Sequence, residues 1–202
     1  MLLFHSPTSP FVRKVMILLH EAEKVDQVTL VPGSGTPLSP NTETQSRNPL
    51  GKIPCLERAE GPALYDSRVI CRYLDSLFDT GLYPQDARLW DSLTLEATGD
   101  GIMDAALSMV YERKLRSADA QDENWVESQW NKIEHSLKTL DERWVSHLAG
   151  PLCIGQISLA CALGYCDFRH ANRGWREIAP AVADWHAKFA KRNSYSKTEP
   201  AD

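Results

Sequence analysis

The chain has 202 residues, of which 43% are hydrophobic and 24% are charged, so it can fold as one large domain or as two small ones. Its net charge of −5 argues against a nucleic-acid-binding protein, because contacts with phosphates need a basic face. No apolar run is long enough to span a membrane, and the first residues lack the pattern of a secretory signal, so we expect a cytoplasmic protein.

Near the start of the chain, the spacing of apolar residues changes from that of a strand to that of a helix. Met1–Phe4 is a short apolar run that predicts a buried strand, and the apolar residues from Val12 to Leu19 recur at helical spacing. Ser9-Pro10 stands between the two and is typical of a helix start, because a serine oxygen can accept a first-turn N–H and proline loses no hydrogen bond there. Ser9 is therefore a helix cap, or a hydroxyl that helps the positive end of the helix to hold an anion.

The next segments complete a predicted α/β unit with a mixed sheet. The expected elements are a strand at 27–31, a short helix near 42–46, a hairpin with arms at 55–58 and 63–65, and a helix that begins at Asp66-Ser67. Because the first two strands are joined through a helix and the next two through a tight turn, we expect both parallel and antiparallel pairs in a first domain over residues 1–79.

The strand signal ends near residue 79. Glycine and proline interrupt the pattern over residues 80–88, which predicts a linker. Beyond it the expected helices lie at 86–116, 124–147, 156–169 and 180–192. The third is apolar nearly all round, so we expect it to be the central helix of an all-α second domain over residues 89–202. Residues 194–202 are polar and are expected to form a loose tail.

The cysteines and histidines do not form a recognisable metal or redox motif. The five cysteines contain no CxxC pair, and the six histidines contain no HExxH motif or other paired ligand spacing. We therefore expect reduced, buried thiols and no metal.

Four features, taken in this order and spacing, resemble the cytosolic glutathione transferases. They are SPFVRKV at 9–15, NPLGKIP at 48–54, Asp66-Ser67 opening a helix after a hairpin, and the all-helical second half. The resemblance covers essentially the whole chain. The family members that the chain resembles are bacterial and have a serine-type active site. The resemblance implies a thioredoxin-like, glutathione-binding first domain, an all-α second domain that supplies the acceptor-substrate site, and a homodimer.

In this resemblance Ser9 takes the place of the catalytic serine or cysteine at the tip of the first helix. Its implied role is to donate a hydrogen bond to the glutathione sulfur and so to favour the thiolate. Thr8 and Ser6 lie close enough in sequence to compete for the role. We rank Ser9 first because it directly precedes the helix, and Thr8 second.

The resemblance also assigns the residues that would hold the rest of glutathione. Ile53-Pro54 matches a cis-proline step whose backbone pairs with the cysteinyl part, and Lys52 would contact a carboxylate. Asp66-Ser67 matches an acidic-serine pair that holds the γ-glutamyl end. Taken alone, the same residues are an ordinary trans proline, a surface lysine and a helix cap.

The sequence departs from the family pattern in two places. Gln156 and Cys161 occupy two positions that are acidic in many relatives, so we expect Ser158 to cap the central helix without its reciprocal partner. The catalytic cysteine of the beta and omega classes is absent. A serine does not form a mixed disulfide, so thiol-transferase activity is disfavoured.

The predicted function is that of a glutathione S-transferase, which activates glutathione for conjugation to small electrophilic or hydrophobic substrates in detoxification. The alternatives are a glutathione-dependent isomerase or peroxidase, and a glutathione-binding or protein-interaction scaffold with little activity. Six side chains could be available to the acceptor, although each methionine or aromatic side chain among them is more often part of the core: Met103, Leu107, Met109, Val110, Tyr111 and Tyr195. The basic residues Arg169, His170, Arg173 and Arg176 are expected to form a solvated face.

Overall fold

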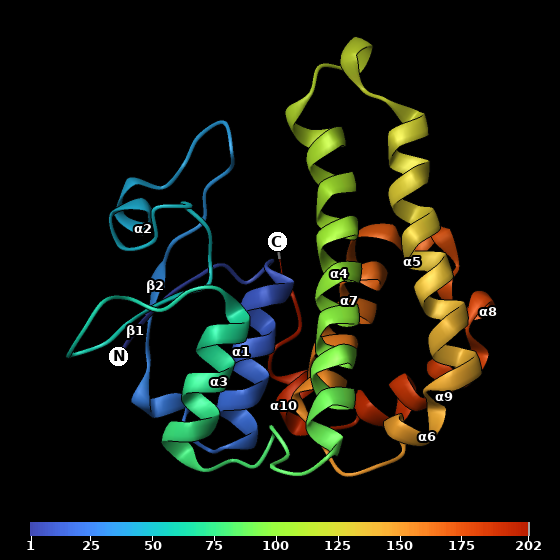
Figure 1. The fold of residues 1–202 in the computed structure, drawn as a ribbon. Helices are drawn as coiled ribbons and strands as arrows, with labels where there is room; N and C mark the ends of the chain where they lie inside the picture. Colours follow the sequence, from blue (N-terminus) through green and yellow to red (C-terminus); the bar gives the residue numbers. More distant parts are fainter. Residues whose placement is uncertain (202) are drawn as a thin grey trace. The chain divides into compact units, whose positions relative to one another are not determined.

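The computed structural model describes residues 1–201 and divides into two compact units (Figure 1). The first unit contains residues 1–89 together with residues 193–201. The second unit contains residues 90–192 and is entirely helical. This is the α/β domain plus all-α domain that the sequence predicts. No helix within residues 1–201 is both long enough and apolar enough to cross a membrane.

The first unit is built on a three-stranded mixed sheet. Its strands are β1 (Leu2–His5), β2 (Thr29–Pro32) and β3 (Cys55–Glu57), in the order β2-β1-β3. β1 runs parallel to β2 and antiparallel to β3, as the sequence predicts for a mixed sheet. The side chains of Leu3 and Phe4 in β1 are completely buried.

The predicted hairpin is reduced to a single bridge. Leu56 and Leu64 exchange both backbone hydrogen bonds, at 2.9 and 2.8 Å, but residues 63–65 do not form a strand. Pro62 has no N–H to extend the ladder on one side, and helix α3 begins three residues after Leu64 on the other. The expectation of a strand over 63–65 is therefore wrong.

Four helices complete the first unit, and two of them pack against each other. They are α1 (Pro10–Glu21), α2 (Thr42–Arg47), α3 (Ser67–Phe78) and α10 (Asn193–Ser196). In Figure 1, α1 and α3 lie side by side and begin at the same end of the unit. Their facing apolar side chains, among them Leu18 and Leu74, are fully buried. Burial of these faces holds the starts of the two helices next to each other.

The C-terminal segment is folded onto the first unit. Ser194 and Tyr195 are only 5% and 6% exposed, and α10 packs against α1. The expectation of a loose tail is therefore wrong for residues 194–198, and residue 202 lies outside the described residues. The polar composition of this segment did not reveal that its partners lie on α1, about 180 positions earlier in the sequence.

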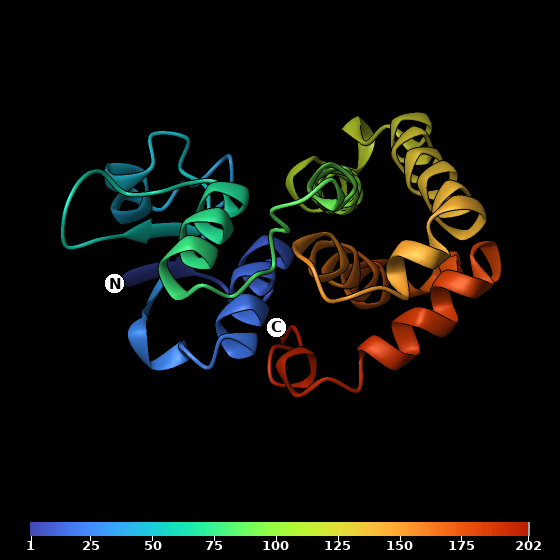
Figure 2. The same cartoon turned by 60° about the horizontal axis from the view of Figure 1, so that its bottom comes forward.

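The second unit consists of two long helices and a set of shorter ones. They are α4 (Arg88–Leu115), α5 (Glu123–Arg143), α6 (Val145–Leu148), α7 (Ile154–His170), α8 (Trp175–Ile178) and α9 (Pro180–Phe189). Figure 2 shows α7 in the middle of this unit. The residues from Ile154 to Cys166 are all buried, which confirms the prediction of a central helix.

The start of α7 differs from the expectation. The helix begins at Ile154, and its cap residue Cys153 makes no side-chain capping bond. Ser158 therefore lies in the second turn and cannot cap; its hydroxyl instead donates to the Glu96 carbonyl at 3.1 Å and contacts Asp100 Oδ1 at 2.8 Å. The prediction that Ser158 caps the helix is wrong, because the helix begins four residues before this serine.

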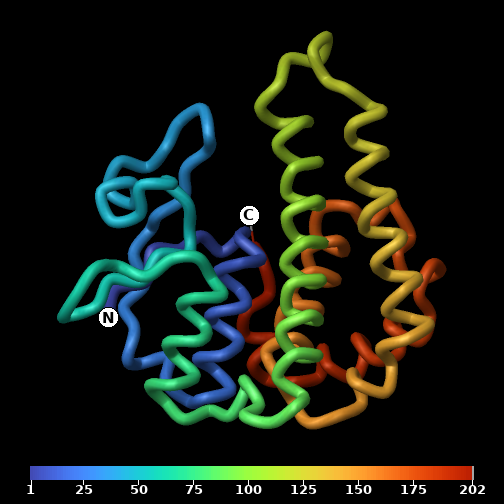
Figure 3. Tube along the Cα trace, viewed as in Figure 1, coloured from blue at the N-terminus to red at the C-terminus, as the bar shows by residue number. Residues whose placement is uncertain are grey.

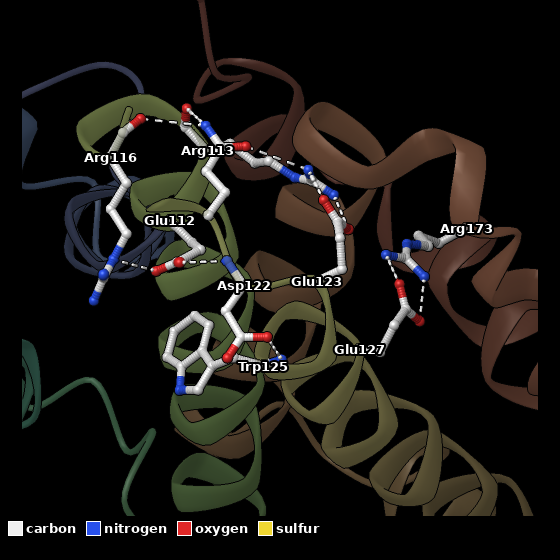
Figure 4. Close-up of polar contacts among 9 residues, drawn as sticks. Glu112, Arg113, Arg116, Asp122, Glu123, Trp125, Glu127 and Arg173 are labelled. Atoms are coloured by element: carbon white, nitrogen blue, oxygen red, sulfur yellow. Dashed lines mark hydrogen bonds and ion pairs between the residues drawn. The ribbon is translucent and has the colours of Figure 1, made fainter. Parts of the chain in front are cut away.

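The connection between α4 and α5, which Figure 3 traces at one end of the helical unit, is held by charged side chains. Arg113 binds both carboxylate oxygens of Glu123, and the Asp122 N–H donates to Glu112 Oε1 at 3.0 Å (Figure 4). The Gln121 side-chain amide also donates to two backbone carbonyls near the end of α4. These contacts satisfy backbone groups that the ends of two helices leave open.

Two residues of the basic cluster after α7 are engaged in ion pairs. Arg173 pairs with Glu127 of α5, and Arg176 pairs with Asp167 of α7 (Figure 4 shows the first pair). These two charges are therefore paired at a partly exposed surface, but His170 of the same cluster is buried, so the expectation of a solvated face is wrong for His170.

His170, at the end of α7, is buried as a neutral imidazole. Its Nε2 lies 2.9 Å from the Ala106 carbonyl of α4, and since a carbonyl can only accept, this nitrogen carries a proton. Burial lowers the pKa of His170 below its ordinary value of 6.5, and the nearby charges of Arg173 and Arg169 lower it further, while the bond to Ala106 opposes the shift.

We expect His170 to make the protein less stable in acid. Between pH 6.5 and the lower pKa of the folded state, the unfolded chain binds a proton that the native state does not, so the free energy of unfolding falls as the pH falls. Urea unfolding at pH 7.5 and pH 5.5 should show this loss, and the loss should be smaller in His170→Gln, which keeps an N–H for Ala106. The pKa values of His5 and His20 are also lowered, and their effect cancels in the comparison. An equal loss in both proteins would contradict the assignment.

Candidate functional site

Ser9 is the cap of α1, as the Ser9-Pro10 pair predicts. Its backbone is extended, its Oγ accepts the N–H of Val12 at 3.3 Å, and Pro10 occupies the first helical position. The Ser9 carbonyl accepts the N–H of Arg13 at 3.0 Å. Within residues 1–201 no acceptor engages the hydroxyl hydrogen of Ser9, and the side chain is half-buried. The hydroxyl can therefore donate to a ligand while its oxygen accepts from the helix.

Thr8 and Ser6, the competing hydroxyl residues, hydrogen-bond to each other. Their side-chain oxygens are 3.0 Å apart, and the Thr8 N–H also reaches Ser6 Oγ at 3.4 Å. One of the two hydroxyl hydrogens is used in this contact. Neither oxygen accepts a helix N–H, as that of Ser9 does; the ranking of Ser9 before Thr8 stays a prediction.

The NPLGKIP segment forms a loop organised by one buried asparagine. Asn48 is 1% exposed; its side-chain amide donates to the Lys52 carbonyl at 2.8 Å and its side-chain oxygen accepts the N–H of Leu50 at 3.0 Å. The Lys52 side chain itself is exposed. Asn48 was not among the predicted site residues, although an asparagine directly before Pro49 is a known turn signal.

The peptide bond between Ile53 and Pro54 is cis, which confirms the prediction made from the resemblance. The backbone N–H and C=O of Ile53 have no hydrogen-bond partner within residues 1–201, and the residue is half-buried. The Ile53 side chain packs against Gly33, where an added Cβ would lie 3.1 Å from Ile53 Cγ2 and 2.9 Å from Phe4 Cβ. This packing leaves the backbone of Ile53 available for pairing with an extended ligand.

Asp66 and Ser67 form the start of α3. Asp66 is the cap residue: its Oδ1 accepts the N–H of Arg68 at 3.1 Å, and its Oδ2 pairs with the Arg68 guanidinium at 2.8 Å. Burial opposes the charge on Asp66, but the hydrogen bonds and charge of Arg68, together with the charge of Lys14, leave its pKa below the ordinary value. Ser67, at the first helical position, is 2% exposed. Both expected readings, cap and anion site, are compatible with this arrangement.

The predicted glutathione-binding residues all lie in the first unit, on three elements that pack together. Ser9 precedes α1, Ile53 precedes β3, and Ser67 begins α3. The charge of Lys14, in the second turn of α1, acts on Asp66 at the start of α3, so these two helix starts are neighbours. The positive ends of two helices therefore meet in one region, which suits a ligand with more than one negative charge.

Two of the buried thiols, those of Cys55 and Cys166, are weak acids. Burial raises the pKa of Cys55 to about 11 and that of Cys166 to about 12. Such thiols are poor nucleophiles at neutral pH. Within residues 1–201, no three His, Cys, Asp or Glu side chains are grouped as metal ligands.

The side chains expected to be available to an acceptor fall into two groups. Met103 and Met109 are 0% and 2% exposed and belong to the core of the helical unit, and Tyr195 is buried in the first unit, so these three are core residues, the more frequent role of such side chains. Leu107, Val110 and Tyr111 of α4 are half-buried. An amphipathic helix places core and surface side chains one turn apart, and the sequence alone does not say where the core ends.

Comparison with known proteins shows a match along most of the chain. A family model described as "Glutathione S-transferase, N-terminal domain" matches residues 8–77, and one described as "Glutathione S-transferase, C-terminal domain" matches residues 123–188. The "Uncharacterized GST-like protein YibF" of Escherichia coli K12 is 34% identical over 206 residues, which cover 99% of this chain and 98% of that protein.

Solved structures of two complexes are similar to this chain. A glutathione transferase family member from Pseudomonas fluorescens Pf-5, with bound glutathione, has a TM-score of 0.97 and 43% identity and covers 100% of this chain and 99% of its own. A family member from the same organism with bound S-(propanoic acid)-glutathione has a TM-score of 0.92 and 42% identity, with both chains covered completely. Both structures therefore contain glutathione or a derivative of it.

Proposed function

Since the chain belongs to the glutathione S-transferase family, we propose that it binds glutathione in a domain over residues 1–79 and activates the sulfur for addition to a small electrophile. The observation that carries this proposal is the Ser9 hydroxyl, which accepts the Val12 N–H at the start of α1 and keeps its own hydrogen for a ligand. The bound glutathione in a relative that is 43% identical over the whole chain supports the choice of ligand.

The chemistry follows from the position of Ser9. A thiol has a pKa of about 8.5, so only a few per cent is ionised at neutral pH, and a lowering by one unit needs about 1.4 kcal/mol of preference for the thiolate. A hydroxyl hydrogen bond and the positive end of α1 both stabilise a negative sulfur. The thiolate then attacks the electrophilic carbon to form a C–S bond, while a C=C π bond at that carbon breaks and its electron pair moves onto the rest of the acceptor. The thiol proton leaves to solvent, and solvent returns a proton to the adduct.

The rest of glutathione would be held by the other elements of the first unit. The unpaired backbone of Ile53 can form two hydrogen bonds with the cysteinyl part, and Lys52 is exposed and can pair with a carboxylate. Ser67 and the first amides of α3 suit the γ-glutamyl carboxylate, while Asp66, which Arg68 helps to keep ionised, suits the ammonium group.

For the acceptor we propose a small electrophile that yields a thioether of glutathione. A relative that is 42% identical binds S-(propanoic acid)-glutathione, which is such a thioether. In the domain proposed for residues 89–202, the half-buried Leu107 and Tyr111 of α4 are the side chains we expect to contact the acceptor. The homodimer and the cytoplasmic, detoxifying role that the family implies remain part of the proposal.

The thiol of bound glutathione provides the test. We expect the protein to be retained on immobilised glutathione, and the thiolate absorbance of bound glutathione to titrate at least one unit below that of the free thiol. A bound thiol with an unshifted pKa would leave only a glutathione-binding scaffold, and a protein that is not retained would remove glutathione from the proposal.

A further inference from the structure

The C-terminal segment, residues 193–201, makes polar contacts along most of α1. In Figure 1 the chain passes from α10 alongside α1 to its end. Tyr195 and Ser194 are 6% and 5% exposed, so this is a packed contact. Neither the family motifs nor the proposed chemistry assigns a role to it.

Arg13 of α1 is the centre of the contact. Its Nη2 donates to the Tyr195 carbonyl at 3.1 Å, its Nε donates to Thr198 Oγ1 at 3.4 Å, and its guanidinium carbon lies 3.9 Å from the centre of the Tyr195 ring. The Thr198 hydroxyl donates in turn to the Ser194 carbonyl at 2.8 Å. Arg13 is 5% exposed, so its planar guanidinium is held by hydrogen bonds at its edge and by the ring on its face.

A second anchor lies two turns further along the helix. The Ser194 hydroxyl donates to Glu21 Oε1, at the last residue of α1. Burial lowers the pKa of His20, and the charge of Lys197 lowers it further, which places this lysine near the same end of the helix. The segment therefore holds α1 at residue 13 and at residue 21.

The contact reaches Ser9 through the backbone of the first turn. The Arg13 N–H donates to the Ser9 carbonyl at 3.0 Å, and the preceding N–H, that of Val12, donates to the Ser9 hydroxyl. The ends of helices fray, and a hydroxyl on a frayed turn spends less time in the orientation that a ligand needs. Holding the Arg13 side chain therefore limits the movement of Ser9.

We propose that Arg13 is a positioning residue: by binding Tyr195 and Thr198 it keeps the first turn of α1 ordered and the Ser9 hydroxyl directed at the glutathione sulfur. This inference rests on the proposed function for the role of Ser9. It gives the C-terminal segment a part in thiol activation, although the segment lies at the opposite end of the sequence.

The test compares Arg13→Gln and Tyr195→Ala with wild type in three measurements. We expect the pKa of the bound thiol to rise by about 0.5 to 1 unit and kcat at neutral pH to fall roughly three- to tenfold. The KM for glutathione should stay within about twofold, because Ile53 and Ser67 bind from other elements. Hydrogen exchange of the first-turn amides of α1 should become faster.

One variant serves as the control. Arg58→Gln removes a similar arginine of the first unit, which donates to the Pro62 carbonyl and lies 5.2 Å from the Tyr73 ring, away from α1. It should leave thiol acidity, kcat and first-turn exchange unchanged.

The outcomes separate this inference from the proposed function. Variants that unfold more easily but keep the wild-type thiol pKa, kcat and first-turn exchange would overturn the inference. If the wild-type bound thiol has an ordinary pKa, the proposed function fails, and the exchange rates then decide alone: faster exchange in Arg13→Gln supports the ordering role, and unchanged exchange overturns it. If Arg13→Gln does not fold, Arg13→Lys, which keeps the charge without the planar fork, takes its place in the same measurements.

Discussion

Replacing Ser9 with alanine is expected to raise the pKa of bound glutathione by about one to two units and to lower kcat/KM at neutral pH by roughly 10- to 100-fold. The estimate corresponds to the loss of one hydrogen bond to a charged group, worth about 1.5–3 kcal/mol. The affinity for glutathione should change little, since Ile53 and Ser67 are untouched. Absorbance titration of the bound thiolate and steady-state kinetics with a small electrophile measure the two effects.

Ser9→Ala also removes a helix cap, so a loss of stability has to be separated from a loss of chemistry. Asn41 provides the control: its side-chain oxygen caps α2 in the same unit by accepting the Thr44 N–H at 2.8 Å. Each alanine substitution should lower the free energy of unfolding by about 1 kcal/mol, but only Ser9→Ala should change the acidity of the thiol.

A thiol pKa that stays low in Ser9→Ala would contradict the assignment of Ser9. The remaining donors would then be the first amides of α1 and the hydroxyl of Thr8, which the structure places in contact with Ser6. Thr8→Val distinguishes them, because it removes the hydroxyl and leaves the amides in place.

The parts of the molecule that the sequence predicted are those in which local signals agree. Ser9-Pro10 defines the start of α1 by capping and backbone geometry alone, and the apolar run after Ile154 predicts a buried helix in any fold. The cis bond before Pro54 was predicted only through the family motif, since base rates favour a trans bond.

The parts that could not be predicted depend on distant partners. The polar segment after Asn193 is ordered because Arg13, a residue that looks like a surface arginine on an amphipathic helix, binds it. Ser158 has the sequence context of a cap, yet its hydroxyl belongs to a contact with Asp100 of another helix. Side chains of this kind have several possible partners, and only the tertiary structure selects one.

The close approach of α4 to α7 is another such contact, and it was not visible in the sequence. A Cβ built on Gly99 of α4 would lie 2.5 Å from Ser158 Oγ and 2.7 Å from the Ser158 carbonyl carbon of α7. On the other side, a Cβ on Gly155 would lie 2.7 Å from the Ser92 carbonyl oxygen. Because backbone atoms cannot move aside as a side-chain end can, the two helices would have to separate if either glycine carried a side chain.

Gly99→Ala is therefore expected to destabilise the protein, although alanine is the better helix former by about 1 kcal/mol. Overpacking against backbone costs about 3 kcal/mol, and separation of the helices weakens the Ser158 hydrogen bonds by about 1 kcal/mol. After the gain in helix propensity is subtracted, the net loss of stability is about 3 kcal/mol, or roughly 6–12 °C in Tm.

Gly101, two residues along the same helix, has nothing within 4 Å of its added Cβ and is exposed. Gly101→Ala should therefore raise the stability by about 0.5–1 kcal/mol. Thermal and urea unfolding of the two variants should shift in opposite directions, and a stabilised Gly99→Ala would show that α4 and α7 are not in close backbone contact in solution.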